Sequence, residues 1–218
     1  MIGTYTFYND FINCPHKAWH KHVLKDVPFE ITPELEHGRK VHTALEDRIN
    51  KGIDLDPDFL GHVNVVCEVF DSLSEVIPVR AEYFIGMRSD GTGCTWDDSK
   101  VWFRGKLDVA VMTPKVAWLI DWKTGKPRED PFELECQAML LHATHPSIIE
   151  LIGEYYWVKE KRFGKRYELN PVKAFERVMK LYNKVCQYEN MMNWPKQSSP
   201  LCAWCPVKEC ENWKPRLK

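Results

Sequence analysis

Two short motifs carry residues whose types and spacing suit metal-assisted chemistry. The first is Gly105-x-x-Asp108, and the second is Asp121-x-Lys123 at the end of an apolar segment. Alternate side chains of a β-strand share a face, so Asp121 and Lys123 should point the same way. A hairpin between the motifs would bring Asp108 beside Asp121, and two converging carboxylates form a hard oxygen site suited to Mg²⁺ or Mn²⁺. A neighbouring lysine could orient water or stabilise charge on a phosphate.

His42 could add a third metal ligand. It lies on a predicted helix, and Gly38, one turn earlier on the same face, would let the helix approach a sheet closely. Leu35, Leu45 and Ile49 are expected to form the buried stripe of that helix. A lone histidine on an apolar face is more often a core residue than a ligand, but beside two carboxylates it fits a metal site.

Other polar residues near these motifs have two interpretations each. Glu82 precedes the Gly105 motif on a predicted strand, and Gln137 follows the Asp121 motif on a predicted helix. In the functional interpretation, both residues support the metal ligands or bind a phosphate. In the structural interpretation, Glu82 is an ordinary strand carboxylate and Gln137 is a surface amide of the helix. Three nearby cations also have two interpretations: they are solvated surface charges, or they contact a nucleic-acid backbone. They are Lys106, Lys126 and Arg128.

A cysteine cluster near the C-terminus suggests a second metal centre. Cys202, Cys205 and Cys210 offer three thiolates in a C-x2-C-x4-C pattern, and Cys14 is the candidate for the fourth ligand. Four thiolates suit a [4Fe–4S] cluster or a tetrahedral Zn²⁺ ion, and the spacing does not distinguish them. Either would tie the two ends of the chain together and add folding free energy. The cysteines within predicted helices are interpreted as core thiols: Cys67, Cys136 and Cys186.

Composition limits the classes of protein to consider. The chain has 218 residues and 44% hydrophobic residues, which fits one globular domain with a small appended lobe. A net charge of −1 excludes a polycation that coats DNA, so a nucleic-acid site would have to be a local groove. No apolar run reaches the roughly 20 residues of a membrane span, and residues 1–5 do not resemble a signal peptide. We therefore expect a cytoplasmic protein with reduced cysteines and no membrane contact.

Four helix starts are indicated by a capping residue followed by proline at the first helical position. They predict helices at about 33–51, 57–76, 131–144 and 171–191. Asp130 and Glu133 also resemble a capping box at the third of these starts.

Between the second and third helices the hydrophobic period changes to two, which predicts strands at 80–87, 101–112 and 116–123. A further hairpin is expected from 154–161 and 165–169, with its turn at Phe163-Gly164. The stretch after Asn193 lacks periodicity and is interpreted as a ligand-bearing tail. The order of elements favours a mixed α/β sheet with helices against it.

The motifs together resemble the PD-(D/E)xK nuclease superfamily and, within it, its RecB-like and Cas4-like branch. The resemblance covers about residues 38–141 and implies a single nuclease domain, 1–218, with a restriction-endonuclease-like core at about 33–170. It implies a metal ion held by His42, Asp108, Asp121 and the carbonyl of Trp122, with Lys123 as the catalytic lysine. The branch usually has tyrosine four residues after the motif glutamine. Leu141 stands there, which puts that substrate contact in doubt.

The same branch has one cysteine before its core and three clustered after it. The resemblance thus implies a [4Fe–4S] lobe formed by about 1–25 and 171–218, joining the N- and C-termini, with Zn²⁺ as the alternative. It implies a Mg²⁺- or Mn²⁺-dependent exonuclease that acts on single-stranded DNA or duplex ends, beside recombination or DNA-processing proteins. Two alternatives remain at this stage, a catalytically silent DNA-binding module and a zinc-stapled structural protein.

Overall fold

The chain forms two compact units. Apart from the side chains of residues 62 and 74, the computed structural model describes residues 1–28, 30–74, 77–128 and 130–214. The first unit comprises Met1–Ile2 and Ile31–Phe175, and the second comprises Gly3–Glu30 and Glu176–Lys218. Each unit has its own packing and is described by itself.

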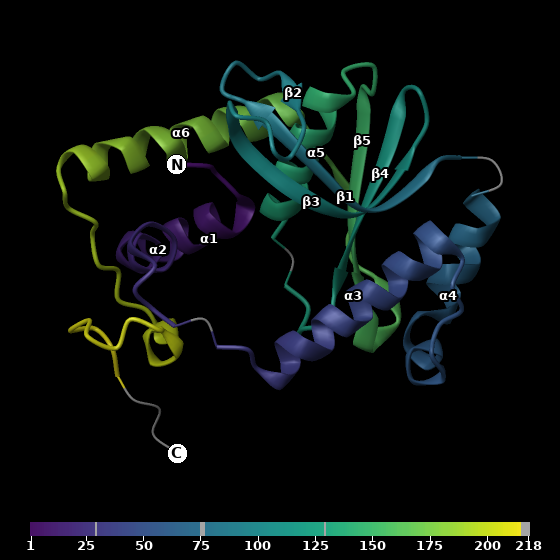
Figure 1. Cartoon of the computed structure of the whole chain (residues 1–218), viewed down its shortest axis with the longest axis horizontal. Helices are drawn as coiled ribbons and strands as arrows, with labels where there is room; N and C mark the ends of the chain where they lie inside the picture. Colours follow the sequence, from purple (N-terminus) through teal and green to yellow (C-terminus); the bar gives the residue numbers. More distant parts are fainter. Residues whose placement is uncertain (29, 75–76, 129, 215–218) are drawn as a thin grey trace. The chain divides into compact units, whose positions relative to one another are not determined.

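A mixed sheet forms the centre of the first unit (Figure 1). Its strand order is β2-β1-β3-β4-β5-β6, and β7 also pairs with β5. Only β4 and β5 are parallel among the described pairs, and α5 lies between them in the chain. This confirms the predicted α/β fold with a mixed sheet. The strands are β1 Val79–Arg88, β2 Gly93–Cys94, β3 Val101–Met112, β4 Val116–Lys123, β5 Glu150–Trp157, β6 Arg162–Phe163 and β7 Tyr167–Glu168.

Three of the four predicted helices begin where the caps indicate, whereas α5 begins one residue later than predicted, because Pro131 and not Asp130 is its N-cap. α3 spans Pro33–Lys51, α4 spans Pro57–Ser74, α5 spans Phe132–Thr144 and α6 spans Pro171–Asn190. Thr32 caps α3 by accepting a hydrogen bond from the Leu35 amide at 3.3 Å. The expected end of α4 at residue 76 lies outside the described residues.

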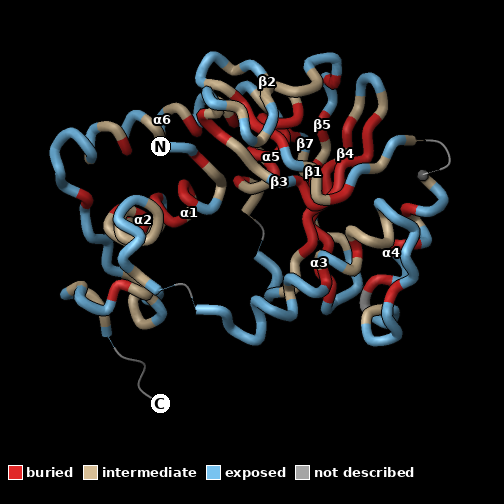
Figure 2. Tube along the Cα trace, viewed as in Figure 1, coloured by how far each residue is buried: buried red, intermediate tan, exposed pale blue. Residues whose placement is uncertain are grey.

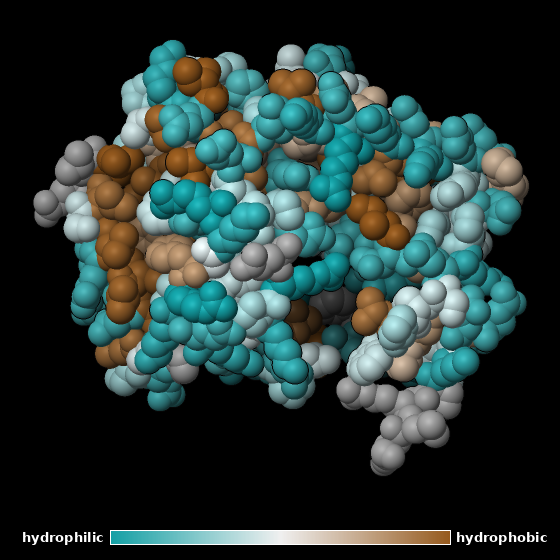
Figure 3. All heavy atoms as spheres, turned by 180° about the vertical axis from the view of Figure 1, so that it is seen from behind, coloured by the Kyte–Doolittle hydropathy of each residue, from teal (hydrophilic) through white to brown (hydrophobic). Residues whose placement is uncertain are grey.

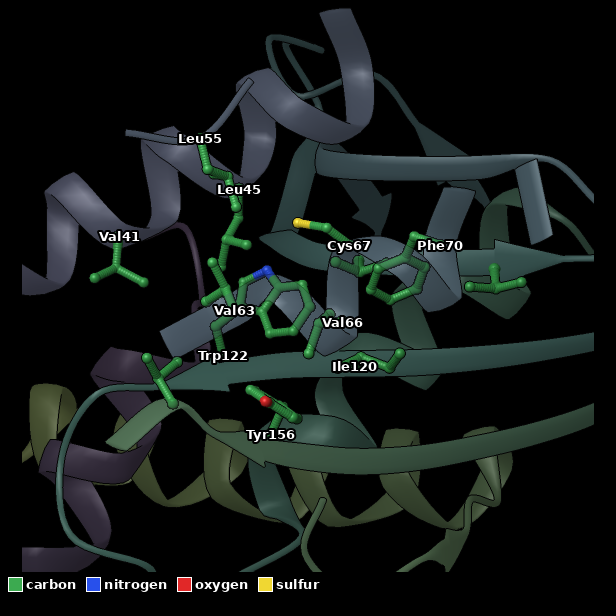
Figure 4. Packing of buried hydrophobic residues seen from close by; sticks show 13 residues of the cluster. Val41, Leu45, Leu55, Val63, Val66, Cys67, Phe70, Ile120, Trp122 and Tyr156 are labelled. Atoms are coloured by element: carbon green, nitrogen blue, oxygen red, sulfur yellow. The ribbon is translucent and has the colours of Figure 1, made fainter. Parts of the chain in front are cut away.

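Helices cover both faces of the sheet. Consecutive residues of β4 point to opposite sides, so Trp122 packs its ring against Phe70 of α4 while Asp121 contacts Gln137 of α5. Buried residues follow the strands and the helix faces that meet them (Figure 2). Figure 4 shows the apolar cluster on the α3–α4 side, where Trp122 lies among residues of both helices. The Asp121-x-Lys123 motif is therefore anchored by the close-packed core around Trp122.

Two predictions about apolar residues and strand limits are wrong in part. Leu35 is 37% exposed, because the first turns of α3 are exposed and its buried stripe starts at Val41 and continues through Leu45. β5 begins at Glu150 and not at residue 154, because its parallel pairing with β4 starts there.

The expected turn at Phe163-Gly164 is also wrong. Phe163 belongs to β6 and pairs with Tyr156. The chain reverses earlier, through a 3-10 helix at Val158–Glu160 and Lys161, which has a left-handed φ of 51°.

Short helices build the second unit together with the later part of α6. α1 spans Tyr5–Asn13, α2 spans Pro15–Ala18, and a π-helical turn follows at Trp19–Leu24. Phe11 of α1 packs near the rings of Tyr188 and Trp194, at centroid distances of 5.7 and 5.9 Å. After Asn193 the described residues contain one short 3-10 helix, Pro200–Trp204. None of the described helices is long and apolar enough to cross a bilayer.

Candidate active site

The site begins where the pairing of β3 and β4 stops. Their backbone register runs from Met112↔Ala117 to Val109↔Ile120. At the next position, Oδ2 of Asp108 accepts a hydrogen bond from the Trp122 amide at 3.0 Å. The Asp108 side chain thus takes the place of a backbone partner, and the 6% exposed carboxylate is held at the point where the strands separate.

Three ligand types converge at this point. One possible ligand atom from each of His42, Glu82 and Asp108 lies within 4.8 Å of the others. Nδ1 of His42 is 3.4 Å from Asp108 and 3.6 Å from Glu82. Nε2 of His42 donates to the Trp122 carbonyl at 3.2 Å, with the tautomer assigned from this contact. The structure thus brings together the His42 side chain, the Asp108 carboxylate and the Trp122 carbonyl, three of the groups that the resemblance implied as metal ligands.

Glu82 is closer to this group than the sequence indicated. Its backbone has a φ of 51°, a left-handed conformation that is rare within a strand for a residue with a side chain. Such strain costs about 1–3 kcal/mol and is found mainly at functional sites. One carboxylate oxygen of Glu82 is buried and has no hydrogen-bond partner among the residues that the structure describes, and the other contacts Lys106.

Asp121 belongs to a second, adjoining group around Lys123. Nζ of Lys123 lies 2.5 Å from Asp121 and 2.6 Å from Oε2 of Glu133, and 5.3 Å from the centre of the Tyr155 ring. Nε2 of Gln137 donates to the other oxygen of Asp121 at 2.9 Å. This network fixes the buried Asp121 and the half-buried Lys123 in position.

Glu133 is the site residue that sequence reasoning missed. The sequence favoured a capping role, but its carboxylate contacts Lys123, and the Phe132 amide is capped by Asp130 at 3.1 Å. The signal available was its position four residues before Gln137, which places both on one face of α5.

The pKa shifts at the site all have the same direction. Burial opposes a positive charge on His42, but the Asp108 and Glu82 carboxylates outweigh it and raise the pKa of His42 to about 10. Burial likewise opposes the charge of Lys123, and Asp121 and Glu133 outweigh it and raise the Lys123 pKa. Burial and neighbouring carboxylates raise the pKa of Asp121, and burial raises the pKa of Glu133, although Lys123 acts against both.

Raised pKa values for acids and bases together indicate an excess of negative potential in a poorly solvated space. A divalent cation would relieve that potential. Hard carboxylate oxygens with one imidazole and a backbone carbonyl suit Mg²⁺ or Mn²⁺, so the residues present fit such an ion.

Two of the three candidate phosphate-binding cations lie apart from these groups. We call His42, Glu82 and Asp108 the metal group, and Lys106 pairs with Glu82 at its edge. Lys126 and Arg128 are exposed in the loop after β4, and Arg128 lies 3.9 Å from Asp130.

In the second unit, the cysteines from the two ends of the chain approach one another. The Gln197 amide lies 3.5 Å from Sγ of Cys14, and the His16 amide donates to the Pro195 carbonyl. Burial raises the pKa of Cys205, and the nearby thiols of Cys14 and Cys202 act in the same direction. Among the described residues, no three of the sulfurs meet the 4.8 Å spacing of the carboxylate–histidine group.

The chain resembles known proteins in sequence and in fold. The sequence model of the PD-(D/E)XK nuclease superfamily matches residues 59–210. A solved structure from Eubacterium rectale, of a protein provisionally assigned as an exonuclease, is 11% identical with a TM-score of 0.58. That match covers 96% of this chain and 86% of that chain. An alkaline exonuclease from Laribacter hongkongensis is 10% identical with a TM-score of 0.33, covering 88% of this chain and 93% of that chain. No curated protein matches the sequence.

Proposed function

The chain belongs to the PD-(D/E)XK nuclease superfamily, and on that basis we propose that it is a Mg²⁺- or Mn²⁺-dependent deoxyribonuclease that acts as an exonuclease. The observation that supports this proposal is the meeting of His42, Glu82 and Asp108 within 4.8 Å, beside the pair of the buried Asp121 and the half-buried Lys123. These are the parts needed to hold a divalent ion next to a base or charge-stabilising group.

Each residue has a role in this proposal. His42, Asp108, Asp121 and the Trp122 carbonyl hold the ion, and Glu82 is a further ligand or supports one. The bound ion would polarise the scissile phosphate and lower the pKa of a water molecule. Lys123 orients the attacking water and stabilises the negative charge that develops on the phosphate.

Gln137 fixes the orientation of Asp121 through its 2.9 Å hydrogen bond. A ligand that is oriented by a hydrogen bond in this way binds metal more tightly than one that is free to rotate. Gln137 is therefore a positioning residue in the proposed site.

The test is digestion of end-labelled and circular DNA, single- and double-stranded, with Mg²⁺ or Mn²⁺. We expect loss of nucleotides from ends and resistance of circles. Asp108→Ala should abolish cleavage, whereas Asp58→Ala, at an exposed acid of α4, should leave it unchanged. Cleavage by Asp108→Ala at the wild-type rate would refute the site, and absence of cleavage by the wild type with either ion would refute the nuclease function.

Such an enzyme consumes DNA ends, so we place it in recombination or end processing. Its partners would be the proteins that generate or protect those ends. Cleavage of circles as fast as linear DNA would contradict this role, because it would show an endonuclease.

We further propose that Cys14, Cys202, Cys205 and Cys210 hold a [4Fe–4S] cluster in the second unit, with Zn²⁺ as the alternative. The approach of Cys14 to the thiols of Cys202 and Cys205 supports a shared centre. Iron and sulfide should be present in anaerobically purified protein and be lost in Cys14→Ala, with a lower melting temperature. Cys94→Ala, in the first unit, is the matched control and should keep the metal. Stoichiometric zinc in colourless wild-type protein would refute the cluster, and full metal content in Cys14→Ala would refute the ligand set.

A further inference from the structure

Beside the metal group lie two aromatic rings and two cations from β1, β3 and the segment between β2 and β3, and they are exposed or half-buried. We call Phe84, Trp96, Arg104 and Lys106 the aromatic strip. Phe84 is paired with Lys106 in the register of the two strands. Alternate strand residues share a face, so Arg104 and Lys106 lie on one face of β3. Lys106 contacts Glu82, so the strip begins beside the candidate metal ligands.

The rings of the strip are arranged as a platform. Phe84 is 51% exposed, and its ring meets that of Trp96 edge to face, with centroids 5.1 Å apart. The Arg104 guanidinium lies 4.3 Å over the Trp96 ring. Nζ of Lys106 lies 5.9 Å over the Phe84 ring while it also contacts Glu82, which connects the strip to the metal group.

Gly86 explains why Trp96 reaches this position. A Cβ atom at Gly86 would lie 2.9 Å from the Thr95 carbonyl and 2.9 Å from Val101. Only a residue without a side chain lets the segment that carries Trp96 lie so close to β1. The two rings border a hollow of about 530 Å³. That volume is within the range of small-ligand sites.

We propose that the aromatic strip is a base-stacking subsite, which binds an unpaired nucleobase of the DNA strand next to the scissile phosphate. This inference rests on the proposed nuclease function. A flat ring stacks on any base, but only where that base is not already stacked in a duplex. Arg104 and Lys106 supply positive charge for the adjoining phosphates, in a chain whose net charge is −1. The subsite would thus require a single-stranded stretch of substrate at the site.

The first test measures binding and chemistry separately. Single-turnover cleavage of a single-stranded oligonucleotide, at increasing enzyme concentration, gives an apparent Kd and a rate at saturation. For Phe84→Ala and Trp96→Ala we expect Kd to rise about 5- to 150-fold, the effect of losing about 1–3 kcal/mol of stacking per base. The saturated rate should stay unchanged, since the rings do not touch the reacting atoms.

Conservative variants separate stacking from a structural role. Phe84→Leu keeps apolar volume but removes the flat ring, and Phe84→Trp keeps a flat ring. Stacking requires that Phe84→Leu binds weakly and Phe84→Trp binds like the wild type. A wild-type Kd for Phe84→Leu would overturn the proposal.

Abasic oligonucleotides identify the contact from the DNA side. One abasic position near the cleaved bond should weaken binding to the wild type by the same factor as Phe84→Ala. Phe84→Ala should bind the abasic and the intact oligonucleotide with the same Kd, because the stacking contact is already absent in this variant. Additive losses would show that the ring and the base do not interact and would overturn the proposal.

A matched control removes an exposed apolar side chain elsewhere. α4 carries such residues, among them Val65, which is 61% exposed. Hydrophobic side chains gather on the left of the back view in Figure 3, the side on which α4 lies after the turn from Figure 1. Val65→Ala should leave Kd unchanged. A wild type that cleaves no DNA would refute the nuclease function. A wild type that cleaves DNA, with Phe84→Ala and Trp96→Ala variants that bind DNA as tightly as it does, would refute only the subsite.

Discussion

At the scale of single residues, Lys123 is held more firmly than a surface lysine of a strand would be. Two carboxylates and an aromatic ring surround its ammonium group, from Asp121, Glu133 and Tyr155. This removes the freedom of a long side chain before substrate arrives, which is the preorganisation that charge stabilisation requires.

Replacement of Lys123 should therefore affect chemistry more than binding. Lys123→Ala is expected to lose on the order of a hundredfold or more in single-turnover rate, as when one preorganised stabiliser is removed. The apparent Kd for DNA should change little. A variant that lost affinity but kept its saturated rate would show that Lys123 only contacts phosphate.

Glu133 should act through Lys123. In Glu133→Gln the lysine keeps Asp121 as its only carboxylate partner within the described contacts, so its orientation becomes less defined. We expect roughly a tenfold lower kcat with KM unchanged, about the effect of 1.4 kcal/mol. Glu135→Gln, in the same first turn of α5, controls for the effect of charge on the helix. Equal losses in both variants would argue that helix charge, and not the contact to Lys123, is responsible.

At the scale of elements, the junction of β3 and β4 has two roles that can be separated. Asp108 completes the hydrogen bonding of the Trp122 amide and supplies charge to the site. Asp108→Asn keeps an acceptor for the amide and removes the charge, whereas Asp108→Ala removes both.

Both variants should be inactive, but they should differ in stability. Asp108→Ala leaves a buried amide unpaired and should lower the free energy of unfolding by about 1–3 kcal/mol more than Asp108→Asn does. Urea unfolding of the two proteins measures this difference. Equal stability of the two variants would show that the Trp122 amide finds another partner.

Elements defined by local signals were predictable, and those defined by distant partners were not. The Thr32 cap and the period of β4 depend on neighbours in the chain, and both were predicted from the sequence. The start of β5 depends on parallel pairing with β4, which is formed across a helix. α1 was missed since Thr4, which caps it, is not followed by proline.

The same reasoning applies to the candidate site. Asp108, Asp121 and Lys123 share faces and hairpin geometry that a period of two predicts. Glu82 reaches the metal group through a left-handed backbone angle, and Glu133 through a contact across a loop. The spacing of hydrophobic residues predicts neither a left-handed backbone angle within a strand nor a contact between side chains across a loop.

At the scale of the whole molecule, the second unit contains a buried acid with three basic partners. The Asp10 side chain is 8% exposed and contacts Lys17 at 2.7 Å, Lys21 at 2.8 Å and His22 at 2.8 Å. Burial opposes ionisation of Asp10, but these three contacts outweigh it and hold the pKa of Asp10 well below its usual range.

A lowered folded-state pKa means that ionised Asp10 stabilises the fold above its unfolded pKa, about 3.9, and that this stabilisation is lost as pH falls below that value. Asp10→Asn should lower stability by about 2 kcal/mol at pH 7, the contribution of a charged hydrogen bond. The difference from the wild type should shrink in urea unfolding at pH 3. Asp26→Asn is the control acid, and an undiminished difference at pH 3 would exclude the electrostatic explanation.

The second unit is assembled from Gly3–Glu30 and Glu176–Lys218, with the whole of the sheet between them in the chain. During synthesis the earlier segment leaves the ribosome first, but its packing partners Tyr188 and Trp194 do not exist until the sheet has been made. Closing so long a loop is slow, so Cys14 stays apart from Cys202, Cys205 and Cys210 for most of that time. The metal centre proposed for these four cysteines would therefore form only after the chain is complete. Pulse proteolysis during refolding should find cuts within Gly3–Glu30 after the strands have become protected; protection of that segment first would contradict this order.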